Sequence, residues 1–123
     1  MGAGLGGFAS AVEVAPVVGP EAGALVIMGG GGKDHAFELI FAKFVELAGG
    51  KDARIVIVTT AASSSPDYEY TQSGAARYAK EKLGVADATV LHTHDSKQAD
   101  TAEFVAPITK ATGVWFGGGR QWR

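Results

Sequence analysis

The stretch RIVIVT, residues 54–59, decides the fold class of this chain. Residues 55–58 alternate Ile and Val, β-branched residues that favour strands, and they leave no polar face. A strand that is apolar on both faces is typical of the interior of a parallel sheet, where helices cover both sides. We therefore expect residues 54–59 to form a buried strand of an α/β domain.

Other short apolar runs lie on either side of this strand, at residues 24–28, 88–91 and 113–116, and each is predicted to be a strand. Between the first two runs, Asp34 is a suitable N-cap for a helix. Gly49 and Gly50 are suited to end that helix. Apolar residues recur through it at the spacing of one buried helix face: Phe37, Ile40, Phe41, Phe44, Val45 and Ala48.

A second helix is predicted from the cap Ser65 to residue 83, with Pro66 at its first position. A third helical stretch covers residues 97–110, with Phe104, Val105 and Ile108 facing inward. Pro107 lies inside it and predicts a kink or two shorter helices. Strands and helices thus alternate, which predicts a three-layer α/β/α domain with a parallel sheet of about four strands.

Composition excludes several classes of protein. The 123 residues are 46% hydrophobic and 20% charged, as in ordinary globular proteins. The net charge of -2 gives no basic surface for nucleic acid, and no apolar run approaches the ~20 residues of a membrane span. The absence of cysteine excludes disulfides, thiolate metal ligands and a cysteine nucleophile.

The N-terminal residues 1–22 differ from the rest, because they show neither a helical nor a strand period. They contain no Lys or Arg and no continuous apolar segment, both of which a secretory signal requires. We expect a disordered leader at 1–22 and one domain at 23–123. A cytoplasmic location is favoured, and a degraded export signal, hence secretion, is left open.

Three loops are expected at the carboxyl ends of the strands, where open α/β sheets bind ligands. In the first, Asp34 stands where a dinucleotide fingerprint needs glycine and where a phosphate loop needs Ser or Thr, so a turn and no cofactor are expected. In the second, Ser63, Ser64 and Ser65 lack the G-x-S-x-G elbow of a nucleophile. They are not expected to be catalytic.

His92 and His94 have a spacing that can hold a metal on one face of a strand. His35 is the only other histidine of the sequence. We interpret the pair as a polar strand end and expect no metal.

The third loop begins with Gly117, Gly118 and Gly119. Glycines after an apolar strand let the backbone approach a ligand closely, and their N–H groups can stabilise an oxyanion. Arg120 and Gln121 add donors suited to a carboxylate or an amide, as does Arg123. The alternative, a tight turn before a solvated, charged helix start, fits the spacing equally well.

Three segments of the chain resemble the cyanophycinase and dipeptidase E serine peptidases: LVIMGGGG (25–32), FVELAGGKDARIVIVTTAAS (44–63) and ADTAEFVAPITKATGVWFGGGRQWR (99–123). The terminal GVWFGGGRQWR carries most of the specificity. The resemblance implies a class I glutamine amidotransferase-like (flavodoxin-like) fold and hydrolysis of aspartyl or β-aspartyl peptide bonds. It also implies that Gly117, Gly118 and Gly119 form the oxyanion loop and that Gln121, with Arg120 beside it, contacts substrate.

The sequence departs from that family in one respect: the G-T-S-A-G elbow that carries the family's nucleophile is absent. We therefore expect an incomplete fold, the N-terminal half of such a peptidase truncated before the catalytic Ser and inactive alone, so that its status as an enzyme stays open. An open sheet edge would favour self-association. The alternatives are a non-catalytic module that binds acidic or amide ligands and, disfavoured by the failed fingerprints, a Rossmann-like nucleotide-binding module.

Overall fold

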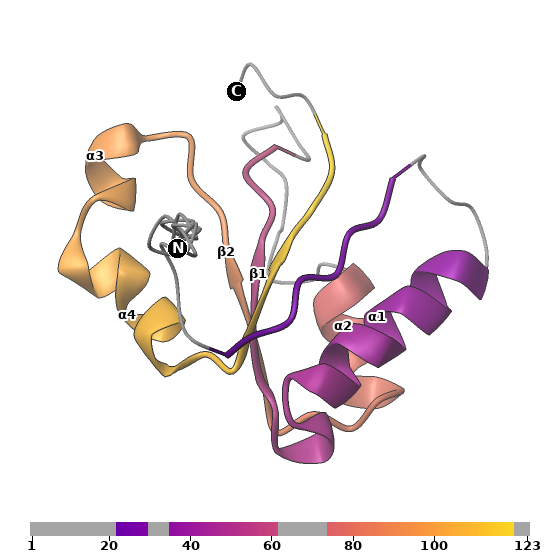
Figure 1. The fold of residues 1–123 in the computed structure, drawn as a ribbon. Helices are drawn as coiled ribbons and strands as arrows, with labels where there is room; N and C mark the ends of the chain where they lie inside the picture. The colour runs from indigo at the N-terminus through magenta and orange to yellow at the C-terminus, as the bar shows by residue number, and fades with distance from the viewer. Residues whose placement is uncertain (1–21, 30–34, 62–73, 120–123) are drawn as a thin grey trace, which may run out of the picture.

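Helices and strands alternate through most of the chain in the computed structural model, which describes residues 22–29, 35–61 and 74–119 (Figure 1). A short 3₁₀ turn, Gly50–Asp52, precedes the first strand. The elements, in chain order, are α1 (His35–Leu47), β1 (Arg54–Val58), α2 (Gly74–Glu81), β2 (Asp87–Leu91), α3 (Ser96–Ala99), α4 (Ala102–Lys110) and β3 (Gly113–Phe116).

The described strands form one parallel sheet in the order β2-β1-β3. Ile57 of β1 is in register with Val90 on one side and Trp115 on the other. Because β1 is paired along both edges and covered on both faces, its residues 55–57 are at most 2% exposed. The buried strand predicted from RIVIVT is confirmed.

Helices lie on both sides of this sheet. Figure 1 shows α1 and α2 on one side, and α3 and α4 on the other. This arrangement confirms the predicted three-layer α/β/α class. Within the described ranges, no helix is both long enough and apolar enough to cross a membrane.

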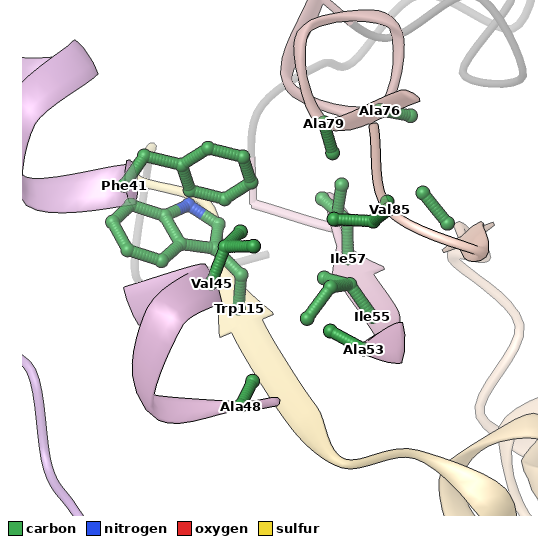
Figure 2. Close-up of a cluster of buried hydrophobic side chains, with 11 residues drawn as sticks. Phe41, Val45, Ala48, Ala53, Ile55, Ile57, Ala76, Ala79, Val85 and Trp115 are labelled. Atoms are coloured by element: carbon green, nitrogen blue, oxygen red, sulfur yellow. The ribbon is translucent and has the colours of Figure 1, made fainter. Parts of the chain in front are cut away.

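The hydrophobic core lies between the sheet and the α1/α2 layer. Figure 2 shows Phe41 of α1 against Trp115 of β3, with Ile55 and Ile57 of β1 in the same layer. The rings of Phe41 and Trp115 are edge to face, with centroids 4.9 Å apart. The apolar face predicted for α1 is confirmed, since Phe41, Val45 and Ala48 are buried there.

The opposite layer is packed less tightly, because none of the residues of α4 is buried. Phe104 and Val105, predicted to face inward, are only half-buried, and Ile108 is 40% exposed. They do face the sheet, but across a cavity. The prediction that these side chains face the sheet is confirmed, but they do not pack closely against it.

The strand predicted at residues 24–28 is absent, so the described sheet has three strands where about four were expected. Leu25 and Ile27 are 85% and 81% exposed, whereas Val26 and Met28 are half-buried. β1 already has partners on both edges, so this segment could pair only with the outer edge of β2 or β3, and it pairs with neither. An apolar run becomes a strand only where another strand offers ladder hydrogen bonds, and the sequence does not show that partner.

The third helical stretch consists of two shorter helices, one of the two alternatives predicted. The break between them lies before Thr101 and not at Pro107. The Thr101 hydroxyl accepts a hydrogen bond from the Phe104 amide and caps α4. The Asp95 carboxylate caps α3 in the same way through the Lys97 amide. The Thr101 cap therefore sets the start of α4, and Pro107 is accommodated inside α4.

Several predictions lie outside the described residues: the leader at 1–21, the cap at Asp34, and the start of the second helix at Ser65 and Pro66. Gly49 and Gly50 follow α1 with φ of 115° and 64°, as expected for residues that end a helix. In the described part of the chain, β2 and β3 each pair with β1 alone. Self-association through a strand edge stays a prediction.

Candidate functional site

Three described loops leave the sheet at its carboxyl edge. Those after β1 and β3 are among the three predicted, whereas the loop after β2 is not, and the predicted loop after residues 24–28 follows no strand. Residues 59–61 follow β1, residues 92–95 follow β2, and residues 117–119 follow β3. Backbone hydrogen bonds continue the sheet into them: the Thr59 amide donates to the Leu91 carbonyl (3.1 Å) and the Gly117 amide donates to the Val58 carbonyl (2.9 Å). The three loops therefore start from fixed positions next to one another.

Two histidine contacts join the first two loops. Oγ1 of Thr59, a residue only 5% exposed, lies 3.0 Å from Nδ1 of His92 and shares a hydrogen bond with it. Nε2 of His94 donates to the Thr60 carbonyl over 3.1 Å. The two imidazole rings lie edge to face with centroids 4.9 Å apart. The pair thus holds the ends of β1 and β2 together.

The pKa of His92 is lowered from its ordinary value of 6.5. Burial is the main cause, because it penalises the charged imidazolium, and the neighbouring His94 adds to the effect. The hydrogen bond to Thr59 acts in the opposite direction and is outweighed. His92 is therefore neutral at pH 7.

This lowered pKa makes folding pH-dependent. Well above pH 6.5 the neutral imidazole predominates in both states. As the pH falls through 6.5 the unfolded chain binds the proton first, so stability is lost. We expect the free energy of unfolding to fall between pH 7.5 and pH 5.5, and His92→Gln to reduce that fall. Urea unfolding followed by circular dichroism at a series of pH values measures it.

The control for this prediction is His35→Gln, because the His35 side chain is 93% exposed at the start of α1. Both variants remove an imidazole, one from a partly buried position and the other from an exposed one. An equal effect of the two substitutions on the pH dependence would contradict the role given to His92.

A metal site at the two histidines would need more ligands. Among the described residues, no group of three or more His, Cys, Asp or Glu side chains is arranged to hold a metal ion. The nearby carboxylate of Asp95 is used to cap α3. The observed role of the histidines is to join two loops.

The glycine loop after β3 has two parts. Gly117 is held against β1, since a Cβ there would lie 3.4 Å from the Val58 carbonyl oxygen, and its amide is used in the sheet. A Cβ at Gly118 would meet nothing within 4 Å, so a ligand has room at that position. Within the described residues, the amides of Gly118 and Gly119 make no hydrogen bond.

The remaining predicted site residues cannot be placed relative to this loop. Arg120, Gln121 and Arg123 lie outside the described residues, as do Ser63, Ser64 and Ser65. The structure thus brings together the ends of β1, β2 and β3, while the contact of Gln121 and Arg120 with substrate stays a prediction.

A cavity of about 690 Å³ opens at the same edge, between the sheet and the α3/α4 layer. The sequence analysis missed it. Its apolar wall is formed by Val58, Leu91, Phe104, Val105, Ile108 and Phe116. The only feature of the sequence that pointed to this cavity was the apolar face of α4. Such a face indicates which side of the helix turns toward the sheet, but not how closely the two pack.

Comparison with protein-family models gives a match to Peptidase family S51 over residues 25–123. The chain belongs to peptidase family S51. It is thus a member of a serine-peptidase family, whose substrates are peptides. The match includes both the apolar run at 25–28 and the glycine loop, on which the resemblance found in the sequence rested. No solved structure matches the chain.

A serine peptidase needs a nucleophile, a base and donors for the oxyanion. In this S51 chain the described residues offer candidates for the last of these, the amides of Gly118 and Gly119. Thr59 and His92 have the spacing of a hydroxyl and a base, but the Thr59 hydroxyl is buried beneath the loops. It holds the ends of β1 and β2 together and is too buried to attack a substrate.

Proposed function

We propose that this chain supplies the oxyanion loop and part of the substrate site of an S51 peptidase that hydrolyses aspartyl or β-aspartyl peptide bonds. The observation that carries the proposal is the loop Gly117–Gly118–Gly119 at the carboxyl edge of the sheet. Gly117 anchors the loop to Val58 through its amide, and Gly118 faces open space. The amides of Gly118 and Gly119 are then the donors to the developing oxyanion.

Arg120 and Gln121 follow this loop directly in the sequence and complete the proposed site. A guanidinium binds a carboxylate through paired hydrogen bonds, and an amide both donates and accepts, so the two suit the aspartyl part of a peptide. The 123 residues contain no G-x-S-x-G elbow. We therefore propose that the domain at residues 23–123 binds such peptides and does not cleave them by itself.

We expect β-aspartyl-arginine to bind the chain, to shift the amide signals of Gly118 and Gly119 in NMR spectra, and to remain uncleaved. Arg120→Ala should weaken binding by about tenfold or more, since it removes a charged hydrogen-bond donor. Titration followed by NMR gives the affinity, and chromatography of the peptide after incubation gives the turnover.

The matched control is Arg77→Ala, because Arg77 is exposed on α2, far along the chain from the glycine loop. Its affinity should equal that of the unsubstituted chain. Equal losses in both variants, or no shift at the glycine loop, would contradict the proposed site. Turnover by the chain would contradict the absence of a nucleophile, whereas binding without turnover also fits a non-catalytic module.

A further inference from the structure

The cavity between the sheet and α4 is a feature of the described structure that the proposed function leaves unexplained. Its volume of about 690 Å³ falls within the roughly 300–1,000 Å³ typical of pockets that hold small molecules. Val58, Leu91 and Phe116 form the sheet side of its wall. Protein interiors are close-packed and rarely contain large voids. An apolar space of this size therefore has the shape and volume of a ligand-binding pocket.

Two residues of the cavity wall adjoin the start of the glycine loop. Phe116 lines the cavity and is followed directly by Gly117. Val58 also lines it, and the carbonyl of Val58 accepts the hydrogen bond from the Gly117 amide. The apolar wall therefore begins two residues before Gly118, close to where a peptide would bind at the loop.

The polar groups of the cavity lie at its end near the carboxyl edge of the sheet: Thr60, Thr93, His94, Asp95 and Ser96. His94 is bonded to the Thr60 carbonyl, and the Thr93 hydroxyl donates to the Gln98 side chain. The deeper wall is apolar and offers no partner to a charged group, and Asp95 at the rim repels an acidic one. The chemistry selects a neutral, bulky, apolar side chain.

We propose that the cavity holds a large apolar side chain, such as that of leucine or phenylalanine, of a peptide whose backbone lies at the Gly117–Gly119 loop. The inference rests on the function proposed above and specifies its substrate class: peptides that join an aspartyl group to a bulky apolar residue. Gly118 binds the backbone of such a peptide, and the α4 layer selects the side chain.

The test compares β-aspartyl-phenylalanine with β-aspartyl-glycine, both titrated into the full chain and followed by NMR of its methyl and amide groups. Burial of the aromatic side chain should make the first bind about tenfold or more tightly. It should also shift the methyl signals of Val58, Val105 and Ile108. Equal affinities for the two peptides would overturn the proposal.

Ile108→Glu places a charge on the cavity wall and should abolish the preference for phenylalanine. Ala106→Glu is the matched control, since Ala106 is exposed on the same helix and does not line this cavity. If Ile108→Glu fails to fold, Ala99→Phe replaces it as the test variant, because its ring would fill the cavity from α3 and should abolish the same preference. An unchanged preference in the folded variant would overturn the proposal.

The probe N-acetyl-phenylalanine amide separates this inference from the function on which it rests, because it carries no aspartyl group. If neither aspartyl peptide binds but the probe shifts the cavity methyls, the aspartyl specificity is wrong and the apolar pocket stands. If the aspartyl peptides bind at the glycine loop with equal affinity and the probe shifts nothing, the pocket is wrong and the proposed function stands.

Discussion

Phe41→Ala is expected to lower the free energy of unfolding by about 3–5 kcal/mol, the range for removing a fully buried aromatic ring. Phe41 is 0% exposed and lies at the centre of the α1/α2 layer. Its ring stacks on that of Phe37 and meets Trp115 edge to face, contacts that alanine cannot make. Urea unfolding followed by circular dichroism measures the loss.

The control for this substitution is Leu39→Ala on the same helix. Leu39 is 71% exposed, so its replacement should change the free energy of unfolding by no more than about 0.5 kcal/mol. If the two variants were destabilised equally, the placement of the core on the Phe41 face of α1 would be wrong.

Gly113→Ala is expected to destabilise the fold by about 1–3 kcal/mol, because the added methyl group has no space. A Cβ at Gly113 would lie 2.8 Å from side-chain atoms of both Phe44 and Ala48, where α1 crosses the start of β3. It would also lie 3.2 Å from the Cδ1 of Ile55, so the strand and helix must separate. Thermal and urea unfolding both report this change.

Gly74→Ala makes the same chemical change and is expected to have the opposite sign. A Cβ at Gly74, the first residue of α2, meets nothing within 4 Å. Alanine restricts the unfolded chain and favours a helix, so a gain of up to about 1 kcal/mol is expected. If Gly113→Ala were as stable as the unsubstituted chain, the close contact between α1 and β3 would be contradicted.

The elements with a strong local pattern were predictable from the sequence. RIVIVT marked the central strand, and the apolar spacing from Phe37 to Ala48 marked the buried face of α1. In both cases the residue pattern within the segment is enough to show which side chains become buried. The parallel order also predicted that the loops after β1 and β3 meet at the carboxyl edge of the sheet, whereas the loop at 92–95 was not among the predicted ones.

The failed predictions concern partners that a local pattern does not specify. Residues 24–28 have the composition of a buried strand, but their place depends on which edge of the sheet is vacant. The break between α3 and α4 lies at the Thr101 cap and not at Pro107, which is accommodated inside α4. The cavity depends on how far α4 stands from the sheet, which no residue pattern encodes.

The unequal packing of the two helical layers has a consequence for how this sequence can change over evolutionary time. The stability of the fold rests on the α1/α2 layer, where mutation is costly, whereas α4 contributes no buried residue. Substitutions in α4 can therefore accumulate with little penalty to folding. Relatives that share the same α1 and β1 are free to diverge at Phe104, Val105 and Ile108, and natural selection can adjust one side of the sheet while the other preserves the fold.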